Sequence, residues 1–355
     1  MTSRTSNQSS DGTFGQSLDG VTATGGLESG ESAVLMQLRE DEVARTNIGI
    51  HNQWRRSARV EVELYDSDGS LVTAHSRNIP AQQTVQLNRP FQKFGGRNDV
   101  ESGYAVVSVL SGQDIYVYGS VVDNLTGDPT AIPMKVGDGA HVQWIAAAAH
   151  GGGAHGSVWR TDVCLLNRSG GIASGEVTFH RDDGESSSFT AELRDGQQLM
   201  VGDVVAQLGM SGSGAIEITA DRPVLAASRT YNSGSNGTFG LFFDGVPVEN
   251  AATSGESVWL PQLRQNSSFR TNIGLLNTGP AGARVRIFLY DASGNQVVSR
   301  WKTVEPDQWI QLQEPFSRLA GRTDIDAGYA RIEVQSGHVI SSVSYTHLRA
   351  HETNC

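Results

Sequence analysis

Hydrophobic and polar residues alternate along many short runs of this chain. In the run 59–65, the alternation places Val60, Val62 and Leu64 on one side of an extended segment and charged residues on the other. The run 284–289 keeps the same alternation. A register slip of one residue would invert both faces, so the pattern predicts half-buried strands of well-specified register.

Turn residues separate these runs at intervals of roughly 8 to 12 positions, which is typical of a sandwich or barrel. Between residues 30 and 135 we predict strands near 34–38, 45–52, 58–65, 70–77, 82–88, 103–109 and 114–123. One helical turn is predicted in 89–98, because the corresponding segment 201–208 has apolar residues at helical spacing. The predicted fold class is all-β, with tandem immunoglobulin-like antiparallel β-sandwich domains.

The chain also repeats itself. The segment 45–49 returns as 270–274, an offset of 225 positions (270 − 45). A weaker copy, 159–167, matches 269–277. The period of 225 therefore holds two related units, which we call type A and type B.

The repeat divides the chain into expected units. Residues 1–25 correspond to the last strand of a type B unit, and the first A unit (30–135), the B unit (140–248) and the second A unit (255–342) follow. The chain is thus expected to begin and end inside units. In that case the leading B unit and the second A unit are both truncated.

The last residues, 343–355, differ from the rest of the chain. They resemble one reading frame of a sequencing-library adapter, and the match to the first A unit is lost here. We therefore expect a tail that is not native, in which His347, His351 and Cys355 carry no functional information.

Composition narrows the class of protein. Glycine at 41 of 355 residues and charged residues at 18% favour turn-rich β structure. Lys and Arg number 27 against 38 Asp and Glu, so the net charge is −11 and no basic cluster is present. We therefore expect no nucleic-acid partner. No apolar run approaches the roughly 20 residues of a transmembrane helix, so no membrane-spanning segment is expected.

Cys164 is the one cysteine outside the tail. No intramolecular disulfide is therefore expected, and stability must come from packing. Cys164 occupies the strand position that holds Gly49 and Gly274 in the A units. This position predicts a small buried hydrophobe and not a nucleophile.

The segment 150–156 (His-Gly-Gly-Gly-Ala-His-Gly) resembles the oxyanion segment of lipase-like hydrolases. That role needs a serine in a Gly-x-Ser-x-Gly turn, and the sequence contains no such pentapeptide. A metal bound by His150 and His155 would need a third ligand at a recognisable spacing, which is not found. The segment is therefore predicted to connect the first two strands of the B unit.

Two acidic segments of the first A unit are candidate metal sites. Asp66 and Asp68 alternate before Gly69, as at the start of a calcium loop. The second A unit keeps Asp291 but has Ser293 in place of the second carboxylate. Turn chemistry explains both copies, whereas calcium explains one.

The segment 123–130 is the second candidate, because Asp123, Asp128, an asparagine and two threonines lie near a strand end. Their oxygens can gather around a cation, or they can form side-chain-to-backbone turns. We favour turns and keep calcium as the one candidate ion; no other cofactor is expected. The corresponding segment of the B unit, 231–238, lacks the acids.

The six tryptophans are candidates for a glycan-stacking surface. Trp259 aligns with Val34, a variation typical of core or inter-unit packing. Only Trp54 and Trp301, beside Arg or Lys in polar surroundings, are predicted to be exposed.

An arginine followed by threonine recurs in all three units, as Arg45, Arg160 and Arg270. An arginine kept through internal duplication indicates a structural anchor that pairs with a carboxylate or caps carbonyls, and not a catalytic residue.

Three motifs carry a resemblance to a known class of proteins. They are Arg-Thr-Asn/Asp-x-x-x-x-Asn in each unit, the segment 118–130, and Ser-Arg-Thr-Tyr-Asn at 228–232. Together they resemble tandem β-sandwich repeat regions of bacterial secreted or cell-surface proteins, over nearly the whole chain before the tail. The resemblance implies an extracellular or cell-surface location and a modular build, and it assigns no functional residues.

No acid, base and nucleophile set recurs in the repeats, so we expect no enzyme. The expected function is a non-catalytic module that serves as a spacer or as a protein-interaction or adhesion surface. The alternative is a glycan- or calcium-binding accessory module of a larger secreted enzyme. The expected partner is accordingly an unidentified protein or a glycan.

Overall fold

The computed structural model describes residues 2–9, 12–22, 25–153, 156–234 and 237–347. Nearly all regular elements in these ranges are antiparallel strands, and the others are short helices. The predicted all-β class is therefore confirmed. No helix in the same ranges is both long and apolar enough to cross a membrane.

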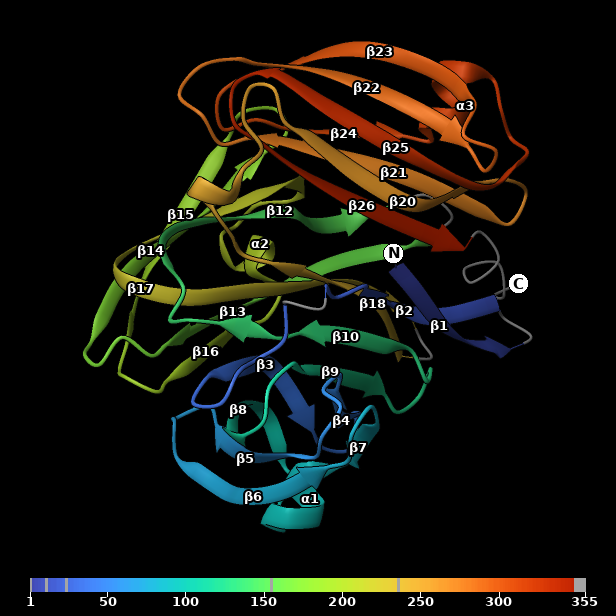
Figure 1. The fold of residues 1–355 in the computed structure, drawn as a ribbon. Helices are drawn as coiled ribbons and strands as arrows, with labels where there is room; N and C mark the ends of the chain where they lie inside the picture. The colour runs from blue at the N-terminus through green and yellow to red at the C-terminus, as the bar shows by residue number, and fades with distance from the viewer. Residues whose placement is uncertain (1, 10–11, 23–24, 154–155, 235–236, 348–355) are drawn as a thin grey trace.

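Two antiparallel sheets form the first A unit (Figure 1). One has the strand order β11-β3-β8-β5-β6 and the other β10-β9-β4-β7. The strands are β3 (Ser32–Glu40), β4 (Ala44–Asn52), β5 (Ala58–Asp66), β6 (Leu71–Ile79), β7 (Thr84–Asn88), β8 (Val100–Ser111), β9 (Ile115–Asp123), β10 (Pro129–Pro133) and β11 (Lys135–Val136). All seven predicted strands are present. Helix α1 (Pro90–Gly95) lies where the sequence predicts a helical turn.

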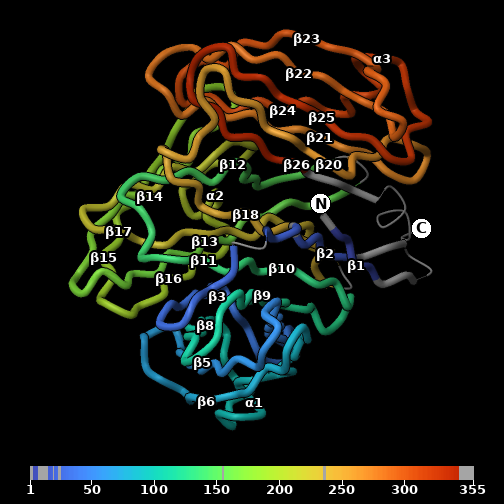
Figure 2. Tube along the Cα trace, viewed as in Figure 1, coloured from blue at the N-terminus to red at the C-terminus, as the bar shows by residue number. Residues whose placement is uncertain are grey.

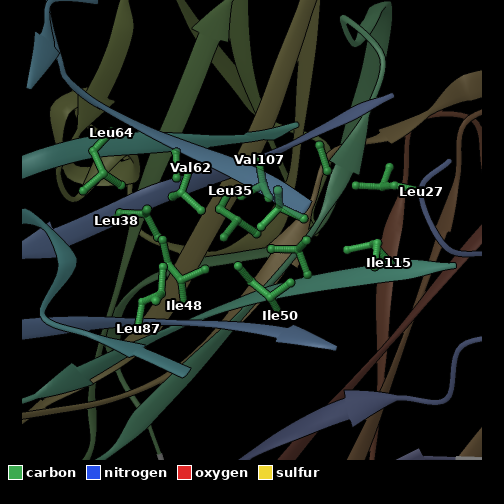
Figure 3. Packing of buried hydrophobic residues seen from close by; sticks show 14 of the residues in the cluster. Leu27, Leu35, Leu38, Ile48, Ile50, Val62, Leu64, Leu87, Val107 and Ile115 are labelled. Atoms are coloured by element: carbon green, nitrogen blue, oxygen red, sulfur yellow. The ribbon is translucent and has the colours of Figure 1, made fainter. Parts of the chain in front are cut away.

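The core of the first A unit lies between its two sheets (Figure 3). Val62 and Leu64 of β5 point toward Ile48 and Ile50 of β4, and all four are buried. The alternation in 59–65 therefore identifies the buried face correctly. Burial of a side chain of this size contributes roughly 1.5–3 kcal/mol, so a core of this kind can hold the two sheets together.

The B unit is built around one long strand, β17 (Gly212–Gly234). Its first half pairs with β12 and β14, and its second half pairs with β13 and β18, so it passes through both layers. The other elements are β12 (Ala140–Gly152), β13 (Val158–Asn167), β14 (Ala173–Arg181), β15 (Ser186–Leu193), β16 (Gln198–Val201), α2 (Val204–Gln207), β18 (Gly237–Asp244), β19 (Val246–Pro247) and the 3-10 turn η2 (Val248–Asn250). The unit encloses its own hydrophobic core.

The second A unit repeats the first. Its sheets are β20-β25-β22-β23 and β24-β21-β26. The elements are β20 (Ser257–Gln265), β21 (Phe269–Asn277), β22 (Ala283–Asp291), β23 (Gln296–Val304), β24 (Trp309–Gln313), α3 (Pro315–Ala320), β25 (Ile325–Ser336) and β26 (Val339–His347). Strand β26 pairs with β21 as far as His347, so it includes residues 343–347 of the tail. Residues 348–355 lie outside the described ranges.

The first residues form a hairpin of β1 (Thr2–Ser9) and β2 (Gly12–Asp19), one strand more than the sequence analysis expects. Thr2 pairs with Asp19, and in the B unit Ala227 pairs with Asp244. Both partners are displaced by 225 positions (227 − 2 and 244 − 19), so the hairpin repeats β17–β18 in register as well as in sequence.

A buried asparagine ties each unit together. Asn52 Nδ2 donates to the carbonyl oxygen of Ile79 at 3.0 Å, and Asn167 and Asn277 make equivalent bonds. An unpaired buried amide would be costly, so this side chain fixes the local chain path. This requirement explains why the Arg-Thr-x5-Asn spacing recurs in the sequence.

The B unit lies between the two A units (Figures 1 and 2). Strands β3 and β8 of the first A unit contact β13 and β16, and β21 and β26 of the second A unit contact β12. Strand β10, of the other sheet of the first A unit, also contacts β18. The two A units therefore meet the B unit through different sets of strands.

Candidate functional site: the seams between the units

Asp66 and Asp68 lie in a tight turn between β5 and β6. Asp66 Oδ1 accepts the backbone N–H groups of Asp68 and Ser70, at 3.1 and 3.0 Å. Asp291 in the second A unit accepts the equivalent pair, at 2.9 and 3.0 Å. Backbone donors thus occupy one oxygen of each of these carboxylates, which is the geometry of a side-chain-to-backbone turn.

Asp123 belongs to a contact between two units. Its Oδ1 accepts the N–H groups of Leu125 and Thr126, both at 2.9 Å. Its Oδ2 accepts the N–H and the hydroxyl of Thr238 in the B unit, at 2.9 and 2.8 Å. Burial acts to raise the pKa of Asp123, but these hydrogen bonds outweigh it and hold the pKa below its usual value.

Asp128 lies beside Asp123 in the same contact and is only 5% exposed. Its Oδ2 accepts the backbone N–H of Gly240 in the B unit at 3.0 Å. Burial raises the pKa of Asp128 to about 6, although the Gly240 hydrogen bond and the charges of Arg229 and Arg4 act in the opposite direction. This carboxyl therefore changes its charge in the weakly acidic range.

Arg229 connects the two units from the side of the B unit. Its Nε donates to Thr130 Oγ1 of the first A unit at 3.1 Å, and its Nη2 donates to Thr238 Oγ1 at 2.9 Å. Burial lowers the pKa of Arg229, an effect that the charges of Asp128 and Asp162 oppose. We call the contacts of Asp123, Asp128 and Thr130 with the β17–β18 hairpin the hairpin joint.

The four candidate metal ligands are not brought together. Asp66 and Asp68 follow β5, whereas Asp123 and Asp128 follow β9 in the other sheet. In the described ranges, no three His, Cys, Asp or Glu side chains are grouped so that they could hold a metal ion.

An apolar patch continues the contact between the first A unit and the B unit. It consists of Val34, Met36, Tyr104 and Val106 packed against Cys164, Leu166 and Leu225. Cys164 is fully buried there, as predicted, and burial raises the pKa of its thiol well above the usual value. We call this patch, the hairpin joint and the contacts of Gln198 the first seam.

Gln198 of the B unit makes the polar centre of the first seam. Its Nε2 donates to the Ser102 hydroxyl and to the Gly103 carbonyl, both at 2.9 Å. Its Oε1 accepts the N–H of Gln37 at 3.2 Å, and its own N–H donates to the Ser67 carbonyl at 2.9 Å. The side chain is 2% exposed, so these bonds replace water and fix the register of the seam.

The second seam joins the B unit to the second A unit. Trp144, Ala146 and Ala215 of the B unit pack against Leu276, Trp309 and Ile340. Ser342 Oγ donates to the Ala146 carbonyl oxygen at 3.4 Å. The second seam is therefore held together mainly by the packing of apolar side chains of complementary shape.

His150 takes part in a charged cluster inside the B unit. Its Nδ1 lies 2.9 Å from Asp203 Oδ1, and Arg160 Nη1 lies 2.5 Å from Asp203 Oδ2. The prediction that Arg160 pairs with a carboxylate is thus confirmed. Arg45 instead bonds to the amide oxygen of Asn124, at 2.8 Å. The second candidate histidine, at position 155, lies outside the described residues.

Arg270, the third predicted anchor, differs from the other two. Its Nε has no hydrogen-bond partner within the described part of the chain. Burial lowers the pKa of Arg270, and the charge of Glu314 opposes that effect. The sequence position is repeated, but its hydrogen bonding is not.

The tryptophans only partly follow the sequence analysis. Trp301 is 45% exposed, as predicted, whereas Trp54 is partly buried. Trp259 is 56% exposed, so the prediction that it packs is wrong. Its equivalent Val34 does pack between units, whereas Trp259 has no such cover from the described part of the B unit.

Sequence reasoning missed the two residues that organise the first seam. Arg229 lies in the repeated Ser-Arg-Thr motif, so its recurrence as Arg4 was a usable signal. Gln198 has no repeat partner within the sequence, and its four bonds depend on residues 67, 102, 103 and 37. Only the fold brings these positions together.

Comparisons with known proteins leave the function open. No protein-family model and no curated protein sequence matches the chain. Among solved structures, Thermotoga maritima 1070 is 16% identical and covers 31% of this chain and 97% of its own, with a TM-score of 0.27. The Anabaena sensory rhodopsin transducer is 16% identical over 26% of this chain and 98% of its own, with a TM-score of 0.22. A tetra-tandem repeat in the extending region of a large adhesion protein is 13% identical over 98% and 81%, with a TM-score of 0.16.

Proposed function

We propose that the chain is a non-catalytic extracellular or cell-surface module in which A and B units form a rigid spacer that carries interaction faces. The location rests on the sequence resemblance. The mechanical role rests on the seams, because both bury side chains of two units against each other.

The observation that carries the proposal is the Gln198 network. A flexible linker between independent domains leaves their surfaces solvated, and relative motion is then the default. Gln198 instead places its amide in a dry contact where two backbone groups and one hydroxyl of the first A unit satisfy it, and its own backbone N–H donates to a third backbone group. Such bonds form only in one relative orientation of the two units, so the seam acts as a fixed joint.

The polar groups that suggest binding chemistry support the same role. Asp123 and Asp128, candidate ligands in the sequence, accept hydrogen bonds from Thr238 and Gly240 of the B unit. Their function in this proposal is to align the hairpin joint.

Distance measurements between spin labels test the proposal. Labels at Lys93→Cys in the first A unit and Arg318→Cys in the second, in a Cys355→Ser background, report on both seams together. We expect a narrow distance distribution that broadens with Gln198→Ala, because loss of these bonds costs roughly 1–3 kcal/mol. A broad distribution in the unchanged chain would contradict the rigid spacer.

Gln197→Ala is the matched control for Gln198→Ala. Gln197 lies in the same turn and accepts the N–H of Arg194 within the B unit, at 3.0 Å. Its replacement removes a glutamine without removing a bond across the seam. The label distances should therefore stay narrow in this variant.

A further inference from the structure

One face of the second A unit is open where the same face of the first A unit is closed. The closed face is the outer side of β3, β8 and β5, where Val34 and Met36 are fully buried by the B unit. The open face is the outer side of β20, β25 and β22, where Trp259 and Pro261 occupy the equivalent positions and are exposed. Figure 1 shows β22 and β23 on the side of the second A unit that faces away from the B unit.

The open face keeps the aromatic pair that the closed face uses. Tyr65 and Tyr104 stack with ring centres 4.9 Å apart and planes 7° apart, and Tyr290 and Tyr329 stack at 4.7 Å and 10°. On the closed face, the Tyr104 hydroxyl donates to the carbonyl oxygen of Gly196 in the B unit at 2.9 Å. Tyr329 is therefore the counterpart of Tyr104, which binds the B unit through its hydroxyl.

The open face also keeps the backbone shape that Gln198 recognises. Gln37 has φ 55° at a bulge of β3, and Gln262 has φ 61° at the same bulge of β20. A left-handed conformation costs free energy in a residue other than glycine, and its repetition shows that this bulge is a conserved part of the A-unit fold. The bulge presents the N–H that Gln198 Oε1 accepts on the closed face.

A third retained feature is a glycine in the turn beside the tyrosines. A Cβ on Gly69 would lie 2.6 Å from the carbonyl oxygen of Gly196, so the B unit can approach only a bare backbone there. Gly294 holds the equivalent position, with φ 81° against 84° for Gly69. Three of the four bonds of Gln198 go to backbone atoms, so sequence changes in the second A unit leave these partners in place.

The side chains around these features differ between the two faces. Glu61 and Val106 of the closed face correspond to Arg286 and Arg331 of the open face. The Arg331 guanidinium lies 4.5 Å from the ring centre of Phe288, and that of Arg286 lies 4.7 Å from the same ring. Nε of both arginines has no hydrogen-bond partner within the described part of the chain. Arg331 also pairs with Glu333 of the same strand, at 2.7 Å, so the open face is aromatic and carries these two arginines against one carboxylate.

The B unit of this chain is suited to the closed face in charge as well as in shape. Its Arg168 lies close enough to Tyr65 and Tyr104 for its charge to act against the rise in the pKa of both phenols that burial causes. The carboxylates of Glu63 and Glu61 act on the pKa of Tyr65 in the opposite direction. On the open face, the same arginine would lie beside Tyr290 and Tyr329, on a face that also carries Arg286 and Arg331. A partner for the open face needs the opposite charge at this point.

We propose that the open face is a docking site for a further B-type unit, one that carries an acidic side chain in place of Arg168. The glutamine and glycine of its 196–198 turn would contact the bulge at Gln262, the turn at Gly294 and the hydroxyl of Tyr329. This inference rests on the proposed function, since it takes the first seam as the way in which units join.

The full chain can supply such a partner once its own B unit is released. In Gly69→Val/Arg168→Glu, with Cys355→Ser, the first seam opens, and the freed B face of one molecule can reach the open face of another. We expect the weight-average mass in sedimentation to rise with protein concentration. The unchanged chain should stay near 38.0 kDa, because its B face is covered.

Cys164 reports on the same event. Its thiol is buried in the first seam, so alkylation should be slow in the unchanged chain and fast in the dilute variant. As concentration rises, docking on the open face should protect it again. Gly69→Val alone should associate more weakly, because Arg168 then faces Arg286 and Arg331.

Adding Gly294→Val is the matched control, because it leaves the same freed B face and blocks the open face, and it strains a turn of positive φ just as Gly69→Val does. Association should be lost. Association that persists in this control, or a reactive Cys164 without any association, would overturn the proposal. Met36→Asp opens the first seam without altering a turn and serves as a second variant if Gly69→Val fails to fold.

A carbohydrate is the competing occupant. Binding of the unchanged chain to polygalacturonate that is lost with Gly294→Val would assign the open face to an acidic glycan, and would also overturn the proposal. The spin-label result on the unchanged chain stands apart from these outcomes, so failure of the docking site and failure of the rigid spacer can be told apart.

Discussion

The two seams of the B unit join similar partners by different means. The first seam combines an apolar patch with buried polar groups, among them Gln198, Arg229 and Asp128. The second seam is mainly apolar and centres on Trp144 and Trp309. Apolar packing tolerates small shifts, whereas hydrogen bonds across a dry contact require one register. The first seam should therefore be specific and sensitive to pH, and the second should depend on shape.

The largest effect is expected at the second seam. Trp144 is 2% exposed, and its replacement by alanine leaves a cavity that the small neighbours Ala146 and Ala215 cannot fill. A truncation of this kind costs roughly 3–5 kcal/mol. We expect Trp144→Ala to lower the denaturant midpoint of the B and second A units, measured by equilibrium unfolding, while Cys164 stays protected from alkylation.

Trp301→Ala is the control, because this tryptophan lies on the far side of the second A unit and is half exposed. Its ring is 4.6 Å from the Arg284 guanidinium, a cation–π contact worth about 0.5–1 kcal/mol at an exposed site. If both tryptophan variants lost the same stability, the second seam would not depend on Trp144.

The first seam is expected to weaken as the pH rises through the weakly acidic range. The pKa of Asp128 is about 6 in the folded chain against an ordinary value of 3.8, so the folded state binds more protons between these values. The contribution of Asp128 is therefore present below about pH 4 and is lost by the time the pH exceeds its folded pKa. The shift corresponds to about 2–3 kcal/mol.

Asp128→Asn isolates this effect, because it keeps an oxygen for the Gly240 N–H and removes the titration. The alkylation rate of Cys164 in the unchanged chain should rise between pH 4 and pH 7 after correction for the intrinsic pH dependence of a free thiol. In Asp128→Asn the corrected rate should be flat across that range. A rate that rises equally in both would place the titrating group elsewhere; Glu40 and Asp162 are other carboxyls whose pKa burial raises.

The sequence predicts the sandwiches well because the local alternation of apolar and polar residues agrees with the burial of one face of each strand in the folded unit. The residues around Val62 that the sequence alternation assigns to the core are the ones that the folded sheet buries. Asn52, Asn167 and Asn277 recur at one spacing because each serves the chain path within its own unit. Repetition reveals constraints of that kind.

Prediction from the repeat fails where two units of the same type have different neighbours in the structure. Val34 and Trp259 occupy equivalent strand positions, and both fit the outer face of a sheet. What differs is the neighbour, since a B unit covers one and not the other. Asp128 was a candidate metal ligand for a similar reason, because its partner Gly240 lies 112 positions away and cannot be inferred from a local motif.

A smaller effect is expected from a single hydrogen bond of the hairpin joint. Thr130→Val removes the acceptor for Arg229 Nε and keeps the shape of the side chain. We expect the first seam to lose about 1 kcal/mol, detected as faster alkylation of Cys164. Thr84→Val is the control, because its hydroxyl contacts His51 at the opposite edge of the same sheet, away from the hairpin joint, at 2.8 Å. Equal effects would mean that Arg229 does not hold the joint.

Calcium should have the smallest effect of all. Both oxygens of Asp123 and one oxygen of Asp66 already accept hydrogen bonds, and the donors would have to turn away before a cation could enter. Extracellular modules bind calcium at roughly 10⁻⁴ to 10⁻³ M, and saturation at 100 times Kd would stabilise the folded chain by about 2.7 kcal/mol. We expect no rise in Tm by calorimetry at such concentrations. A rise that disappears with Asp123→Asn would show that the hairpin joint opens to bind the ion, and would make the first seam a calcium-controlled contact instead of a fixed one.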